Sequence, residues 1–157
     1  MVVATHGTTV LRVCRALLAP ADADDAWSDT FLSALQAYPR LPADANVEAW
    51  LVTIAQRKAI DLTRAAARRN AHTTELSDTA VAPASNGRDL DLASAINRLP
   101  DKQKRAVAYH YLAGLPYAEV AAILGGSPEA ARRAAADGIA TLRRSYPGVE
   151  ADKGDDA

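Results

Sequence analysis

The stretch from 115 to 133 holds the residues whose types and spacing are best suited to binding nucleic acid. Gly125 and Gly126 supply a sharp turn, Ser127 can cap the following helix, and Pro128 fits its first position. Such a pattern describes a helix-turn-helix, whose second helix enters the major groove of DNA with its N-terminal residues leading. Alanine-rich helices joined by a glycine turn also form ordinary antiparallel pairs, so this segment alone leaves both interpretations open. Under the first, six residues face bases or phosphates: Ser127, Glu129, Ala130, Arg132, Arg133 and Arg143.

Charge is distributed unevenly along the chain, although the formal net charge is only −1. Residues 93–146 carry eight basic and four acidic side chains, an excess that favours contact with phosphates. The run Arg64 to Arg69 gives a second basic segment at the end of a helix whose apolar stripe is centred on Trp50. Trp50 is itself more typical of a core residue than of a platform for stacked bases. An acidic cluster comprises Asp22, Asp24, Asp25 and Asp29, and compensation of a helix dipole explains it as well as a binding role does.

No group of residues predicts covalent chemistry. His6, His72 and His110 are isolated, and neither a nucleophile–base pair nor a metal-ligand spacing is present in the sequence. The single cysteine, Cys14, is most simply a small buried side chain on a helix face. We therefore expect neither an enzyme nor a cofactor nor a small-molecule substrate. One cysteine, no apolar leader and no run of membrane-spanning length together predict a cytoplasmic protein without membrane insertion.

The elements that must position these residues are predicted to be helices throughout, because alanine, leucine and arginine are abundant and strand-forming runs are scarce. Apolar residues from Val10 to Leu18 recur at helical spacing, and Pro20 is expected to end that helix, with Asp22 or one of its neighbours capping the next. The second helix is expected to bury a face that includes Ala26, Trp27, Thr30, Phe31, Ala34 and Leu35. Two prolines predict a loop over residues 38–46, after which a third helix starts near Val47.

Two small helical domains follow from this pattern. The first spans residues 1–69 as a three-helix block, and the second spans residues 91–146 as a helix-turn-helix bundle. Polar, small and acidic residues predict a flexible linker over 70–90 and a disordered acidic tail over 147–157. Tyr109, His110 and Tyr111 are expected to be helix-face residues, whether exposed or packed.

Three segments, in order, resemble the sigma-70 family of bacterial sigma factors, in particular its extracytoplasmic-function type. Residues 22–34 are similar to the family stretch D-A-E-D-L-V-Q-E-T-F-L-R-A, and residues 47–61 to F-R-A-W-L-Y-T-I-A-R-N-x-A-I-D. Residues 99–103 and 114–121 resemble L-P-x-x-x-R and G-L-S-Y-x-E-I-A. The second helix of the helix-turn-helix departs from the family at Asp137 and Gly138, where a basic residue and a helix former are expected. Glycine there costs about 1 kcal/mol of helix stability relative to alanine.

This resemblance implies a transcription initiation factor that binds core RNA polymerase and directs it to promoters. The implied contacts with the β′ clamp helices are Asp24, Asp25 and Asp29, and the β flap is the second implied polymerase contact. The first domain would hold an extruded base of the −10 element and its phosphates through Tyr38, Arg40, Asn46, Trp50, Arg57, Arg64, Arg68 and Arg69. The second domain would bind the −35 element through the six residues given above. An anti-sigma factor is a further partner that the family suggests.

Two other functions fit part of the pattern. A stand-alone helix-turn-helix regulator would bind DNA without polymerase, but it has no need of the first domain. A degenerate sigma-like protein could act only as a protein-interaction module. The run of small side chains Ala134, Ala135 and Ala136 in the presumed recognition helix slightly favours this second alternative.

Overall fold

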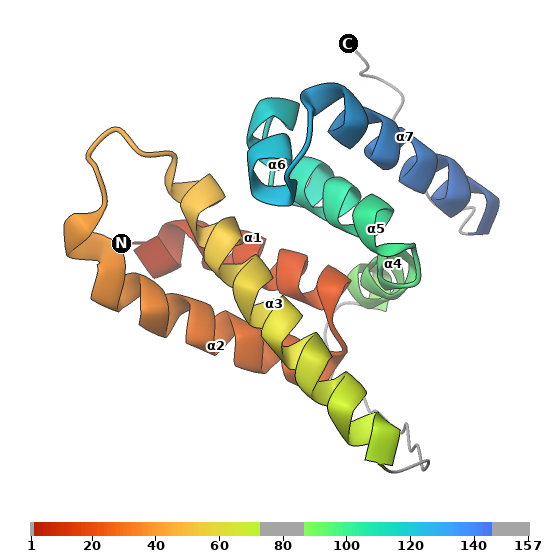
Figure 1. Ribbon diagram of the computed structural model, residues 1–157, viewed down its shortest axis with the longest axis horizontal. Helices are drawn as coiled ribbons and strands as arrows, with labels where there is room; N and C mark the ends of the chain where they lie inside the picture. The colour runs from red at the N-terminus through yellow and green to blue at the C-terminus, as the bar shows by residue number, and fades with distance from the viewer. Residues whose placement is uncertain (1, 73–86, 146–157) are drawn as a thin grey trace.

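The computed structural model describes residues 2–72 and 87–145, and all regular structure within these two ranges is helical (Figure 1). The predicted all-α class with two small domains is confirmed. No helix of the described part is long and apolar enough to cross a membrane. The predicted tail at 147–157 lies outside the described residues.

The first domain is a bundle of α1 (Val2–Leu17), α2 (Pro20–Ala37) and α3 (Val47–His72), with a short 3-10 turn, η1 (Tyr38–Arg40), after α2. Each of the three helices packs on the other two. Several of the core positions are alanines, which bury little area each but let helix axes approach closely. Cys14 is buried among them, as predicted, and burial followed by the charge of Asp24 raises the pKa of its thiol to about 12.

The second domain comprises α4 (Gly87–Asn97), α5 (Asp101–Val107), α6 (Tyr117–Leu124) and α7 (Pro128–Ser145). Between α5 and α6, the backbone widens into a π-helical turn, η2 (Ala108–Leu112). The amide of Ala113 donates to the carbonyl of Ala108, five residues earlier, at 3.0 Å. The helical segment that begins at Asp101 therefore continues to Leu112, but its last turn is of a rarer type that is often found at functional positions.

Four local predictions in the first domain are wrong or incomplete. Pro20 begins α2 as its first residue, where its missing N–H costs nothing, and α2 has no side-chain cap. Asp22 lies in the first turn instead of at the cap. Leu35, expected on the buried face, is 69% exposed. The region predicted as a loop from 38 to 46 starts with η1 before it becomes irregular.

The helices extend into the segment predicted as a linker. The third helix, α3, continues through His72, and α4 begins at Gly87, so only residues 73–86 separate the two helices. These 14 residues lie outside the described part of the chain.

Gly138 has a packing role that the sequence did not reveal. A Cβ atom at this position would lie 2.7 Å from Cγ2 of Val107 and 3.3 Å from Cδ1 of Leu99. The glycine thus lets α7 approach α5 more closely than any other residue would allow. Its helix-propensity cost is offset by this contact.

We expect Gly138→Ala to lower the free energy of unfolding by about 1–3 kcal/mol, because overpacking outweighs the gain in helix propensity. Urea unfolding measures the change. The matched control is Ala136→Gly on the exposed side of the same helix, which should cost about 1 kcal/mol from propensity alone. A Gly138→Ala variant more stable than the wild type would refute the packing role.

Candidate functional site

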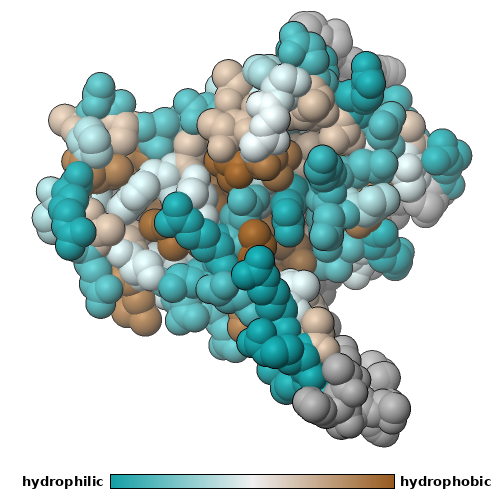
Figure 2. All heavy atoms as spheres, in the orientation of Figure 1, coloured by the Kyte–Doolittle hydropathy of each residue, from teal (hydrophilic) through white to brown (hydrophobic). Residues whose placement is uncertain are grey.

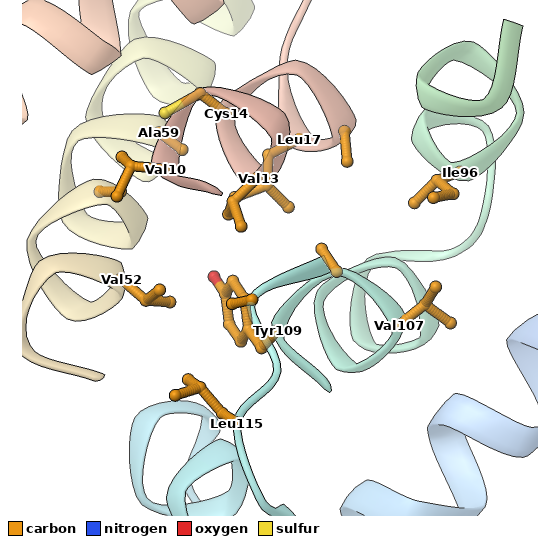
Figure 3. Close-up of a cluster of buried hydrophobic side chains, with 14 of the residues drawn as sticks. Val10, Val13, Cys14, Leu17, Val52, Ala59, Ile96, Val107, Tyr109 and Leu115 are labelled. Carbon is orange, nitrogen blue, oxygen red and sulfur yellow. The ribbon is translucent and has the colours of Figure 1, made fainter. Parts of the chain in front are cut away.

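The two domains pack directly against each other around Tyr109. Its side chain is completely buried and lies between α1 and α3 of the first domain and α6 of the second (Figure 3). Val10, Val13 and Val52 approach it from the first domain, and Leu115 approaches it from the second (Figure 3). We call this region the junction. It continues along α1, which also packs on α4.

The hydroxyl group of Tyr109, at the centre of the junction, forms a hydrogen bond across the domain boundary. The hydroxyl of Tyr109 donates to Oε1 of Gln56 at 2.6 Å, and Nε2 of Gln56 donates to the carbonyl oxygen of Ile123 at 3.2 Å. Burial raises the pKa of Tyr109 far above its usual value, so its hydroxyl stays protonated and donates. An amide can accept one bond and donate another, whereas the arginine that stands here in the quoted family stretch cannot accept.

The helix-turn-helix is formed by α6, the two glycines and α7. Gly125 and Gly126 have positive φ angles of 88° and 124°, which explains why the turn needs glycine. The hydroxyl of Ser127 accepts the amide of Ala130 at 3.0 Å and caps α7, with Pro128 as its first residue. These four residues therefore have the local roles that the sequence predicted.

The remaining predicted DNA-facing residues of α7 are all exposed: Glu129, Ala130, Arg132, Arg133 and Arg143. The first four lie in the first two turns of the helix. Arg143 lies more than two turns further along, so the structure separates it from the others. The guanidinium of Arg132 lies over the ring of Tyr117, with Cζ 4.9 Å from the ring centroid.

Along α3, four predicted residues share one stripe of the helix. Trp50, Arg57, Arg64 and Arg68 follow one another at intervals of seven, seven and four, and the three arginines are exposed. The stripe is about 27 Å long at 1.5 Å per residue, which equals roughly eight nucleotides at 3.4 Å each. Arg69, also exposed, adjoins it. Hydrophilic side chains follow α3 across the front of the molecule (Figure 2).

The loop before α3 brings its predicted residues to the N-terminal end of this stripe. The rings of Tyr38 and half-buried Trp50 are 6.3 Å apart and tilted by 49°. Trp50 packs on the core with part of its surface left open. Asn46 caps α3, because its Oδ1 accepts the amide of Ala49 at 3.1 Å. Arg40 is exposed in η1.

The outer face of α2 combines acidic and apolar side chains. Asp24, Asp25 and Asp29 are exposed, and Leu32 and Leu35 continue the same face with exposed fractions of 60% and 69%. Spacings of three and four residues place Asp25, Asp29 and Leu32 in one row. The sequence pattern predicts a buried Leu35 and makes no prediction for Leu32, because apolar spacing looks the same for a buried face and for an exposed apolar one.

The described residues contain no group of three His, Cys, Asp or Glu side chains that could hold a metal ion. What the structure presents instead is a basic stripe on α3, a helix-turn-helix with exposed arginines, and an acidic and apolar face on α2. These features define a two-domain helical protein of the helix-turn-helix class.

Comparison with known families makes the assignment specific. Residues 2–69 match the family model for sigma-70 region 2, and residues 89–142 match the model for sigma-70, region 4. The chain therefore belongs to the sigma-70 family of sigma factors, of the extracytoplasmic-function type. This is a family of DNA-binding, non-enzymatic factors for transcription initiation. The two matched ranges correspond to the two packed domains.

Solved structures share the fold over nearly the whole chain. CnrH, in its complex with the cytosolic domain of CnrY, is 25% identical, with a TM-score of 0.68 over 93% of this chain and 85% of that one. The sigma factor RpoE in complex with the anti-sigma factor NepR from Bartonella quintana is 22% identical, with a TM-score of 0.77 over 92% and 96%. No curated protein sequence matches the chain.

The polar bridge at the junction predicts a specific pattern of stability. Tyr109→Phe alone should cost about 1–3 kcal/mol, because Oε1 of the half-buried Gln56 loses its donor. Gln56→Leu alone should cost a similar amount, because the buried hydroxyl of Tyr109 loses its hydrogen-bond acceptor. The double variant should lose less than the sum, because neither buried polar group remains. Urea unfolding of the four proteins measures the coupling, and strictly additive losses would contradict the bridge.

Proposed function

We propose that this sigma factor binds core RNA polymerase through the outer face of α2, and recognises promoters through α3 and α7. The single observation that carries the proposal is that one chain presents exposed arginines on two separate helices, α3 and α7, together with an exposed acidic and apolar face on α2. A regulator that acts without polymerase has no use for the third surface.

The face of α2 is suited to a basic partner helix. Three exposed carboxylates would attract positive charge over several ångströms and speed encounter. Burying Leu32 and Leu35 would then contribute about 1.5–3 kcal/mol each at most, reduced by the part of each side chain already covered. These chemical properties support the β′ clamp helices as the partner of α2, as the family resemblance implies. The β flap would be the polymerase contact of the second domain.

The surface of α3 is suited to the −10 element. Arg57, Arg64, Arg68 and Arg69 would neutralise phosphates along one strand. The partly open ring of Trp50, beside Tyr38, would contact an unstacked base near the N-terminal end of α3. Asn46 keeps its amide N–H groups for DNA while its oxygen caps the helix, and Arg40 adds charge nearby.

The surface of α7 is suited to the −35 element. The N-terminal part of α7 would enter the major groove with five residues leading: Ser127, Glu129, Ala130, Arg132 and Arg133. Arg143, near the C-terminal end of α7, would reach the DNA backbone. Alanines at 134–136 leave the middle of the helix without charge, so affinity at −35 should depend strongly on the two leading arginines.

Promoter binding requires the two domains to separate. The elements centred near −10 and −35 are about 25 base pairs apart, or roughly 85 Å at 3.4 Å per base pair. At the junction, α6 lies against α3, which is the longest helix among the described residues and spans only about 39 Å. The closed arrangement therefore cannot engage both elements, and contacts with polymerase would have to replace the junction.

An anti-sigma factor is a further proposed partner. The structural neighbours are a sigma factor in complex with an anti-sigma factor and CnrH in complex with a cytosolic domain of CnrY. The exposed leucines of α2 would give such a partner an apolar anchor. Occupying them would exclude polymerase.

The proposal is tested by measuring how tightly the chain binds purified core polymerase, and then by transcription from a library of promoter sequences. Asp25→Ala with Asp29→Ala should lower core affinity by about tenfold at low salt and less at high salt, because exposed charges are screened. Leu32→Ala with Leu35→Ala should lower it by about tenfold at both salt concentrations, at about 1.4 kcal/mol per factor of ten.

The matched control is Asp101→Ala, which removes one exposed carboxylate from the second domain and should leave core affinity within twofold. Unchanged affinity in all α2 variants would exclude this face as the polymerase contact. If the chain does not bind core polymerase but binds duplex DNA, it is a stand-alone regulator. If it binds neither, it is a protein-interaction module.

A further inference from the structure

Tyr117, the first residue of α6, lies between two other side chains in the second domain. On one face of its ring, the imidazole of His110 is stacked at 3.9 Å between centroids, with only 13° between the planes. The guanidinium of Arg132 also lies over the ring of Tyr117, with Cζ 4.9 Å from the centroid. A residue of the π-helical turn and one from α7 are thus connected through one aromatic ring.

The ring of Tyr117 is fixed from several directions. His110 is itself held by a 2.8 Å hydrogen bond between Nδ1 and the carbonyl oxygen of Leu115, to which the ring nitrogen donates. The exposed ring of Tyr111 meets His110 edge-on, with centroids 4.8 Å apart and planes at 89°. Burial, followed by a hydrogen bond with Tyr111, raises the pKa of Tyr117 to about 12. The phenol of Tyr117 therefore stays neutral under physiological conditions.

This arrangement restricts Arg132 without consuming its hydrogen bonds. An exposed arginine samples many rotamers, and fixing one of them on binding DNA is costly. A guanidinium held over a ring face makes this contact without using its N–H groups, which stay available to phosphate or guanine. Arg133, the next residue, has no ring contact within the part of the chain that the structure describes.

We propose that Tyr117, supported by His110, is a positioning residue that holds Arg132 ready for its contact with the −35 element. The inference rests on the proposed role of Arg132 at −35. It assigns Tyr117 no contact with DNA of its own. It also gives the π-helical turn η2 a second role, because this turn presents His110 as well as Tyr109.

The test is a double-mutant cycle on the full chain bound to core polymerase, with a −35-dependent promoter fragment as the probe. Arg132→Ala should weaken binding by about tenfold and reduce the salt slope by about one. Tyr117→Leu should weaken it two- to fivefold, the range for an exposed cation–π contact, with the salt slope unchanged. In the Arg132→Ala background, Tyr117→Leu should have no further effect. Tyr117→Phe, which keeps the ring, should bind within twofold of the wild type.

Arg133→Ala is the matched control, because the losses from Tyr117→Leu and Arg133→Ala should multiply. Urea unfolding of each variant accounts for any loss of folded protein. If Tyr117→Leu weakens binding equally with and without Arg132, or if it tightens binding, Tyr117 does not position Arg132 and the proposed function still stands. If Arg132→Ala binds like the wild type, the −35 role of Arg132 is wrong and the positioning role fails with it.

Discussion

The buried hydroxyl of Tyr109 is the constraint on which the arrangement of this sigma factor depends. A phenol enclosed by apolar side chains must find an acceptor, and the hydroxyl of Tyr109 donates to Oε1 of Gln56, in the other domain. The same amide then reaches the carbonyl oxygen of Ile123, one residue from the end of α6. Two hydrogen bonds thus help to fix how the basic stripe on α3 lies beside the helix-turn-helix. Both are needed only while the domains are closed.

The π-helical turn makes this possible within a short second domain. One extra residue in the turn directs Tyr109 into the junction and His110 toward Tyr117. Two adjacent residues therefore have separate contacts: Tyr109 joins the two domains, and His110 packs on the ring that Arg132 of α7 also contacts. Close packing elsewhere depends on small side chains, above all Gly138 against Val107. A domain with few large apolar residues achieves a dense interior in this way, and its larger side chains remain available for contacts with partners.

The features that could be predicted from sequence are those with local causes. Gly125, Gly126, Ser127 and Pro128 specify the turn of the helix-turn-helix through backbone preferences and a local cap, and the carboxylates of α2 are visible in the sequence as an acidic cluster. The junction could not be foreseen, because Gln56 and Tyr109 are 53 residues apart and neither has an unusual neighbourhood in the sequence. Leu35 was assigned to the core because periodicity reports which residues share a face, not what covers it. Gly138 was counted only as a weak helix former for the same reason.

The central claim is that this chain is closed when free and opens on core polymerase to reach both promoter elements. The most direct measurement is the distance between spin labels at two exposed positions, Thr63→Cys on α3 and Ala140→Cys on α7, with Cys14 replaced by alanine. We predict one short distance in the free protein and a distance several tens of ångströms longer with saturating core polymerase. An unchanged short distance in a complex that still initiates at a defined start site would contradict the account.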